Sequence, residues 1–258
     1  MSSVHRILAI VEHELRLARR DPTPLIVLIV FPVITIAFLK PALQPALVQA
    51  GYPNATGAEQ VVPGQAVMSA FFLVSLVTIA FFAEHGWGTW DRLRASPATS
   101  IEIVVGKSVP RVAIGIVEFA VVLAAGVVIF GLSMQGDAMA LVPLVVAFCI
   151  CLVLLGVAAT ALSRTAQQAN AFAFTGMVLF GAIGGAFVPF NVLPGWAQAI
   201  APATPTYWAM RGMRSVVLDG QGLGGVLRPT VMLLGMSALF AVVSVWRFRF
   251  DDAKTGFF

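Results

Sequence analysis

The chain has 258 residues, of which 59% are hydrophobic and only 11% are charged. A soluble domain carries about 25% charged residues, so this composition excludes an ordinary soluble fold and predicts an all-α integral membrane protein. The formal net charge of +4 is better explained by membrane topology than by nucleic-acid binding, because Lys and Arg accumulate on the cytoplasmic side of a bilayer.

Residues 1–20 are predicted to form an amphipathic helix that lies in the membrane interface. Charged residues recur through this stretch, so it lacks the apolar core of a cleavable signal peptide. An ordinary solvated N-terminal helix is the alternative reading. The residues that recur on the apolar face at helical spacing are Val4, Ile7, Leu8, Val11, Leu15 and Ala18.

Six apolar stretches follow, with lengths close to or above the roughly 20 residues that a membrane-spanning helix needs. Pro32 is expected to kink the first span. Residues 40–63 are predicted to be a loop, because proline and glycine recur in them. We expect a single transmembrane domain over residues 1–258. The predicted spans cover residues 24–39, 64–83, 108–130, 138–162, 171–188 and 226–246.

Residues 84–107 form the longest polar interruption on the side predicted to be cytoplasmic. Pro97 ends its first part, because the residue before a proline is disfavoured in the helical conformation. Thr99 followed three residues later by Glu102 fits a capping box, which marks a helix start. We therefore predict a short helix at the membrane surface, placed to contact something in the cytosol.

The distribution of basic residues sets the orientation. With both termini on one side, that side holds most of the 16 Lys and Arg residues. Lys and Arg mark the cytoplasmic side, so both termini are predicted to be cytoplasmic in a multi-pass protein of the cell membrane. The basic residues left for the outer side are Lys40, Arg211, Arg214 and Arg228.

Residues 190–214 are then predicted to lie outside. Proline bounds a short stretch in which Leu193, Trp196, Ala197 and Ile200 give one apolar helical face. The stretch is too short to span a bilayer. We predict outer re-entrant helices between the fifth and sixth spans, with Arg211 and Arg214 returning to the interface.

Candidate motifs for chemistry are weak. Gly106-Lys107-Ser108 resembles the end of a phosphate-binding loop, but position 101 holds Ile101 instead of the required glycine, and a membrane span follows. The three histidines are scattered, which argues against a metal site. We expect no enzymatic activity and no cofactor in this chain.

Glu118 is a carboxylate placed well inside a predicted span. A membrane-buried ionisable residue is costly and is by default a functional candidate. The alternative is that Glu118 lies close enough to Arg111 for its side chain to reach the inner interface. Both interpretations stay open from the sequence.

The order of motifs resembles the type-2 ATP-binding-cassette exporter permeases, most closely the bacterial drug- and antibiotic-export branch. The resemblance covers essentially the whole chain. A departure is that Trp87 and Trp90 flank Gly88-Thr89, where polar residues are more usual. The matching motifs are Glu84-x-x-x-Gly88-Thr89-x-x-x-Leu93-x-x-Ser96-Pro97 ending at Gly106-Lys107, Phe187-Val188-Pro189, Leu193-Pro194-Gly195-Trp196, Pro202, Pro205-Thr206-Tyr207, Arg211, Arg20-Asp21-Pro22 and Phe31-Pro32.

The resemblance implies a permease that pairs with a second copy of itself and docks two copies of a cytoplasmic ATPase, which bind ATP and Mg. Residues 1–20 would be the connecting helix and residues 96–105 the coupling helix. The outer re-entrant set would be Pro194, Trp196, Pro202, Pro205, Tyr207 and Arg211. The ATPase-coupling set would be Glu84, Gly88, Thr89, Arg92, Arg94, Ser96, Pro97, Ile101, Glu102, Val104, Val105 and Lys107.

The second and fifth spans lead into these two regions, so we expect them to line the substrate path. Their faces offer aromatic, Met and hydroxyl groups with almost no charge, which suits a hydrophobic or amphipathic substrate such as a drug, antibiotic, lipid or glycolipid. The same residue types are routine in packing and lipid-facing positions. The expected path residues are Ser69, Ser75, Thr78, Phe172, Phe174, Thr175, Met177 and Phe180.

Two other classes of function remain open from the sequence. One is an ion-coupled secondary transporter that uses Glu118. The other is a structural membrane subunit, or a membrane-embedded enzyme with its site at the outer surface. Activity of the chain alone in liposomes under a proton gradient would favour the carrier.

Overall fold

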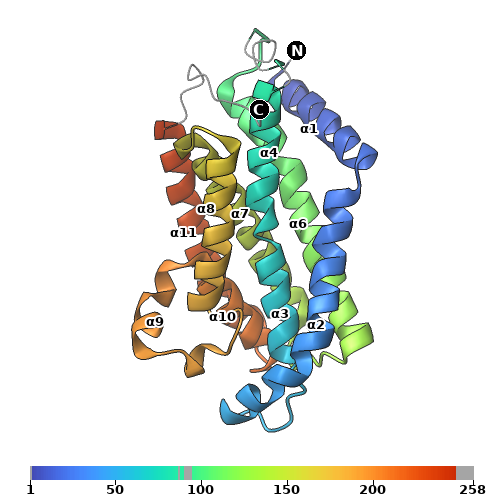
Figure 1. The fold of residues 1–258 in the computed structure, drawn as a ribbon, viewed down its shortest axis with the longest axis vertical. Helices are drawn as coiled ribbons and strands as arrows, with labels where there is room; N and C mark the ends of the chain where they lie inside the picture. Colours follow the sequence, from blue (N-terminus) through green and yellow to red (C-terminus); the bar gives the residue numbers. More distant parts are fainter. Residues whose placement is uncertain (1, 87, 90–94, 248–258) are drawn as a thin grey trace.

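The structure is a computed structural model that describes residues 2–86, 88–89 and 95–247, and these ranges contain helices and no strands (Figure 1). The helices are α1 (Ser3–Arg20), α2 (Thr23–Gln49), α3 (Ala58–Ser69), α4 (Phe72–Gly86), α6 (Ser100–Phe130), η1 (Ala138–Ala140), α7 (Leu141–Leu162), α8 (Ala166–Ile183), η2 (Phe190–Val192), α9 (Gly195–Ile200), η3 (Ala201–Ala203), α10 (Pro205–Val217) and α11 (Leu223–Arg247).

Five of the described helical segments are long and apolar enough to cross a membrane. They are α2, α6 and α11, the run from α3 into α4, and the run from η1 into α7. α8 has 18 residues and lies alongside them in Figure 1. The all-helical class is confirmed, and the count of six spans stays a prediction.

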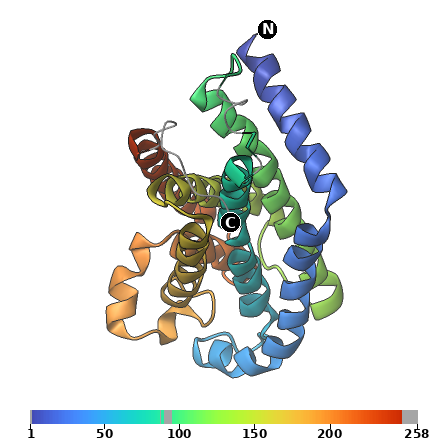
Figure 2. The ribbon, with the colours of Figure 1, turned by 45° about the horizontal axis from the view of Figure 1, so that its top comes forward.

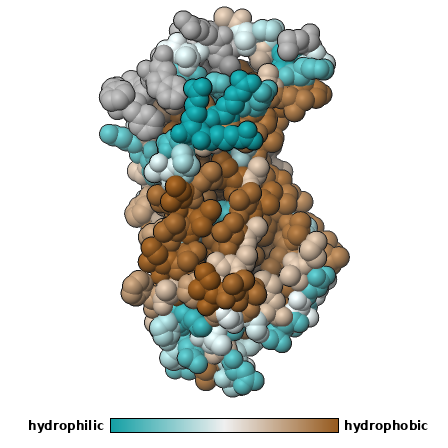
Figure 3. All heavy atoms as spheres, turned by 90° about the vertical axis from the view of Figure 1, so that its right-hand side faces the viewer, coloured by the Kyte–Doolittle hydropathy of each residue, from teal (hydrophilic) through white to brown (hydrophobic). Residues whose placement is uncertain are grey.

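The two ends of the bundle differ in what they carry. α1 and the last turn of α11 lie at one end, which we name the α1 end, and α9 and α10 lie toward the other, the α9 end (Figure 1). An apolar belt separates hydrophilic surfaces at the two ends (Figure 3). Exposed apolar residues such as Phe38 and Val128, 77% and 83% exposed, suit a lipid environment.

The core lies around α7, which packs against α4, α6 and α11. Phe71, Phe119 and Phe148 are buried there. The Phe148 ring centroid lies 6.3 Å from that of Phe71 and 5.9 Å from that of Phe119, both with edge-on geometry. Edge-on aromatic pairs add about 0.5–1.5 kcal/mol beyond area burial. These contacts tie the junction between α3 and α4 to the middle of α6 and α7.

The prediction of a loop over residues 40–63 was wrong. α2 runs on to Gln49 with Pro41 and Pro45 inside it, and Pro63 lies inside α3. A proline removes one backbone donor, and a helix beside other helices tolerates that loss. The described break between these helices is therefore only residues 50–57.

The prediction that a helix starts after Thr99 is confirmed. The prediction that it is a separate short helix at the membrane surface was wrong. The Thr99 hydroxyl accepts from the Glu102 amide at 3.3 Å, and the Glu102 carboxylate accepts from the Thr99 amide at 2.8 Å. α6 then continues unbroken to Phe130. Residues 100–105 are the first turns of the same helix, because apolar residues keep the helical spacing across Gly106.

Cysteine labelling tests the predicted orientation, and the structure corrects one site chosen from the sequence. Ala55 is only 7% exposed, so a cysteine there would label poorly. Neighbouring Asn54 is exposed. We expect cysteines at positions 54 and 198 to react with an impermeant reagent from outside, and a cysteine at position 98 only after permeabilisation. Outside labelling at position 98 would refute cytoplasmic termini.

Candidate functional site: the ionic network at the α1 end

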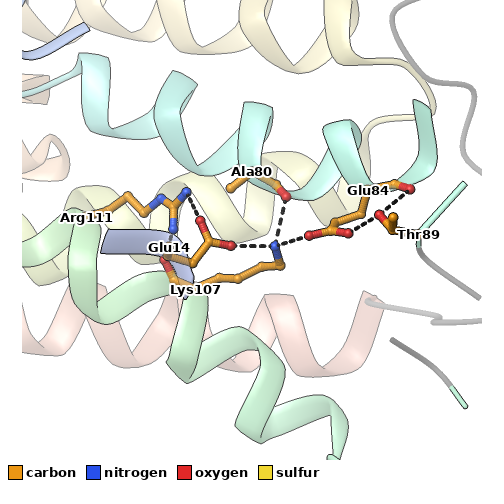
Figure 4. Close-up of polar contacts among 6 residues, drawn as sticks. All are labelled: Glu14, Ala80, Glu84, Thr89, Lys107 and Arg111. Atoms are coloured by element: carbon orange, nitrogen blue, oxygen red, sulfur yellow. Dashed lines mark hydrogen bonds and ion pairs between the residues drawn. The ribbon is translucent and has the colours of Figure 1, made fainter. Parts of the chain in front are cut away.

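A buried ionic network joins α1, the end of α4 and the start of α6 (Figure 4). The Lys107 Nζ donates to a Glu14 oxygen at 2.7 Å, to a Glu84 oxygen at 2.8 Å and to the Ala80 carbonyl at 3.2 Å. Arg111 donates to the second Glu14 oxygen at 2.6 Å. Two cations therefore face two carboxylates, and three elements meet at one lysine.

Local geometry explains why these side chains meet. Lys107 and Arg111 are one helical turn apart on α6, so they share a face. Gly106 lets α1 approach, because a Cβ at this position would lie 2.7 Å from the side chain of Ile10. Figure 2 shows α1 outside the bundle, running beside α6. The close approach places Glu14 against the two cations.

The network is withdrawn from water. The side chains of Glu14 and Lys107 are each 3% exposed, and that of Arg111 is 13% exposed. Burial raises the pKa of Glu14, but the charges of Arg111 and Lys107 outweigh it, so the pKa lies below its ordinary value. Glu14 is therefore a carboxylate at neutral pH. Removing one member of such a network leaves an uncompensated buried charge, which costs about 3–5 kcal/mol.

A second ion pair fastens α1 to the beginning of α6. The Arg6 guanidinium donates to both oxygens of Glu102, at 2.9 and 2.7 Å. Glu102 also closes the capping box and is only 5% exposed. Glu102 is one of the expected ATPase-coupling residues, and in this chain its carboxylate is occupied by Arg6 of α1.

Beside this pair lies an exposed apolar patch, which we name the α6 patch: Ile101, Val104 and Val105. Ile101 is 68% exposed and Val105 is 37% exposed. The patch borders a cavity of about 320 Å³ whose other walls come from α7 and α11. An apolar surface at the polar end of a membrane protein suits a protein partner.

The other predicted coupling residues are partly gathered here. Thr89 donates to the Glu84 carboxylate, and Gly88 has a φ of 66°, a conformation that favours glycine. Ser96 and Pro97 precede the cap of α6. Arg92 and Arg94 lie outside the described residues. The structure thus joins Glu84, Thr89 and Lys107 in one network, with the α6 patch on another side of α6.

Glu118 is buried and does not reach the inner interface. Its side chain lies on α6, is 1% exposed and accepts a hydrogen bond from the Ser69 hydroxyl. The second carboxylate oxygen has no hydrogen-bond partner among the described residues. The alternative in which Glu118 extends toward the inner interface is therefore wrong.

The expected path residues fall into two groups. Ser69 and Thr78 are buried within the chain, and Thr78 donates to the Val74 carbonyl at 3.0 Å. Phe172 and Phe174 are 53% and 64% exposed on α8. Ser75, Met177 and Phe180 are half-buried and Thr175 is exposed. One chain does not bring the whole set onto one surface.

The predicted outer residues are distributed over several short elements. Pro194 precedes α9, Pro202 lies in η3 and Pro205 begins α10. Trp196 is 66% exposed, whereas Ala197 on the same short helix is 3% exposed. Tyr207 and Arg211 line a cavity at the α9 end. Re-entry into the membrane stays a prediction.

Sequence reasoning missed Glu14. The side of α1 that packs on α6 includes Ile7, Ile10 and Glu14, whereas Val4 and Leu8 are 62% and 57% exposed. A carboxylate inside an otherwise apolar stripe was the available signal, since burial of such a group demands a cation. The expected apolar face of α1 is thus divided between α6 and the surface.

Comparison with known proteins gives a consistent family. The family model described as "ABC-2 type transporter" matches residues 5–218. The linearmycin resistance permease protein of Bacillus subtilis is 28% identical over 59% of this chain and 39% of its own length. A probable multidrug ABC transporter permease of Escherichia coli is 29% identical over 56% of this chain and 40% of its own length. The chain therefore spans about two fifths of these relatives.

Proposed function

Since this chain belongs to the ABC-2 type transporter family and is a multi-pass membrane protein, we propose that it is the permease of an ATP-driven exporter. Its substrate would be hydrophobic or amphipathic, taken from the cytoplasm or the inner leaflet. The drug- and antibiotic-resistance names of the two bacterial relatives support this class. ATP and Mg would be bound by a separate ATPase.

The observation that carries the proposal is the set of ion pairs at the α1 end. The Glu14–Lys107–Glu84 network and the Arg6–Glu102 pair tie α1, α4 and α6 together beside the α6 patch. The patch belongs to the first turns of α6, which continues through the bundle. A push on the patch by a bound ATPase would be passed to the spanning part of the same helix, which contains Pro110. Residues 84–107 would then be the coupling segment.

The proposed assembly contains two copies of this chain and two ATPase subunits. Small residues can allow close approach of a second copy, but Gly181 and Gly184 at the end of α8 are already in close contact with other parts of the same chain. A Cβ on Gly181 would lie 2.2 Å from the Met68 sulfur, and one on Gly184 would lie 2.6 Å from Thr206. The dimer rests on the family, and the exposed face of α8 is available for the partner copy.

Reconstitution tests the proposal most directly. Vesicles that hold this chain and its ATPase should accumulate a hydrophobic substrate when ATP is supplied, and vesicles with either protein alone should not. ATP-independent uptake by the chain alone under a proton gradient would refute it. That result would favour the second candidate, an ion-coupled carrier, which is supported by the buried Glu118, one of whose oxygens has no partner in the part of the chain that the structure describes. Glu118→Gln would then abolish the gradient-driven transport.

Substitutions on α8 test the substrate path. We expect Phe174→Ala and Phe180→Ala to change which hydrophobic compounds are exported, because each removes aromatic surface from the proposed wall. The basal ATPase activity of the complex should persist. The measurement is a resistance or export profile at matched expression, with exposed Leu239→Ala on α11 as a control. Profiles like that of the wild type for both variants would move the path to other helices.

A further inference from the structure

A cavity of about 560 Å³ lies at the α9 end, where α10 and α11 meet the first turn of α3 and the end of α8. Three arginines line it: Arg211 and Arg214 from α10 and Arg228 from α11. Its volume falls within the roughly 300–1,000 Å³ of small-ligand pockets. The ionic network at the α1 end has no part in it.

The cavity carries surplus positive charge. Asp219 is the acidic residue of its lining, and its carboxylate accepts from the Tyr52 hydroxyl at 2.6 Å. Arg214 donates to that same hydroxyl at 3.2 and 3.0 Å. Among the described residues, the three arginines form no direct ion pair with a carboxylate. Three guanidiniums therefore face the cavity against one carboxylate.

Two of these cations share one aromatic ring. The Arg211 and Arg228 guanidinium carbons lie 5.7 and 5.8 Å from the centre of the Trp208 ring. The ring is 3% exposed and is fixed by a hydrogen bond from its Nε1 to the Pro202 carbonyl at 2.8 Å. Like charges gathered at one ring repel each other, and an anion between them reverses the sign of that interaction. Such a cluster is the expected form of an anion site.

We propose that this cavity binds a phosphate group, carried by an anionic lipid head group or by a soluble phosphate ester. Arginine forks match phosphate oxygens in pairs, and a tetrahedral phosphate offers oxygens to several forks at once. The Asn191 side-chain oxygen and the Tyr207 hydroxyl oxygen accept from Arg214 and Arg211 at 3.3 and 3.1 Å, so the Asn191 NH₂ and the Tyr207 O–H are the neutral donors for the ester. If the ligand is a lipid, its place in the outer leaflet follows from the predicted cytoplasmic termini. The phosphate site itself does not depend on that orientation.

Thermal unfolding of the purified full chain in a neutral detergent tests this site, because a ligand that binds the folded state raises the unfolding midpoint. The probes are short-chain phosphatidylglycerol, short-chain phosphatidylcholine and glycerol 3-phosphate. Wild type should be stabilised by at least one of the two anionic probes. Arg211→Gln should weaken the apparent affinity about tenfold, and the triple glutamine variant at positions 211, 214 and 228 at least about 100-fold.

The matched control removes three exposed charges at the α1 end: Arg19→Gln, Arg20→Gln and Arg247→Gln. It should keep the wild-type response. Stabilisation by phosphatidylglycerol alone identifies a lipid, and stabilisation by glycerol 3-phosphate identifies a soluble ester. The proposal is overturned by no shift with either anionic probe, by an equal shift with phosphatidylcholine, or by an unchanged response of Arg211→Gln. This binding experiment contains no ATPase. Its outcome is therefore independent of whether the chain acts as an exporter.

Discussion

Replacing Ile101 by aspartate is expected to abolish ATPase binding, or its coupling to export, while membrane insertion is retained. Ile101 is 68% exposed, so the folded chain loses little packing. Position 101 is also in the first turn of α6, where a negative charge is favoured by the helix dipole. In the complex, the same carboxylate would be buried against apolar surface, and the lost aliphatic contact alone is worth about 1–3 kcal/mol.

The measurement is co-purification with the ATPase together with transport in vesicles. Leu162→Asp is the matched control, because it places the same charge on an exposed apolar residue at the end of α7, outside the lining of the cavity beside the α6 patch. The control should retain ATPase binding. Normal export by the Ile101→Asp variant would place the ATPase contact elsewhere.

Replacing Lys107 by methionine is expected to destabilise the chain by about 3–5 kcal/mol and to uncouple ATP hydrolysis from export. The substitution keeps most of the side-chain volume but leaves Glu84 and one oxygen of Glu14 without their cation. Arg111 still holds the other oxygen of Glu14. Two carboxylates then face each other in a site that admits little water, so α1 and α4 should separate from α6.

Thermal unfolding in detergent measures the first effect, and the ratio of ATP hydrolysis to transport measures the second. Arg16→Met on α1 is the control. The side chains of Arg16 and its ion-pair partner Glu12 are 68% and 66% exposed, so this pair should contribute only about 0–1 kcal/mol to the free energy of unfolding. Neutralising the carboxylate that has lost its only cation, by Glu84→Gln, should restore part of the stability to the Lys107→Met variant, because Glu14 keeps its pair with Arg111. Equal losses for Lys107→Met and Arg16→Met would show that the network contributes little.

Acidification gives a third check on the network. The pKa of Glu14 in the fold lies below its ordinary value, because Arg111 and Lys107 favour its charged form. Stability from Glu14 is therefore fully present above that ordinary value of 4.5 and is lost as pH falls through the lower folded pKa. Wild type should lose more stability than Glu14→Gln over this acidic range in thermal unfolding. Parallel losses would contradict the pairing.

The sequence by itself determined the class of the protein and several local features. Hydropathy determined that helices of this composition belong in a membrane, because apolar runs must leave water whatever the tertiary arrangement. The capping box at Thr99 was readable because its partners lie three residues apart. The order of Gly, Pro and polar motifs along the chain indicated the family before any contact was known.

Only the tertiary structure decided which charges meet. Glu14 and Lys107 are 93 residues apart, and Arg6 and Glu102 are 96 apart. Such pairs depend on how each helix is rotated and how closely Gly106 lets α1 approach, which no local pattern encodes. The same holds for the burial of Glu118 against Ser69 and for the arginines around Trp208. Packing also explains why α2 stays helical through its prolines, because neighbouring helices stabilise a segment whose own propensity favours a loop.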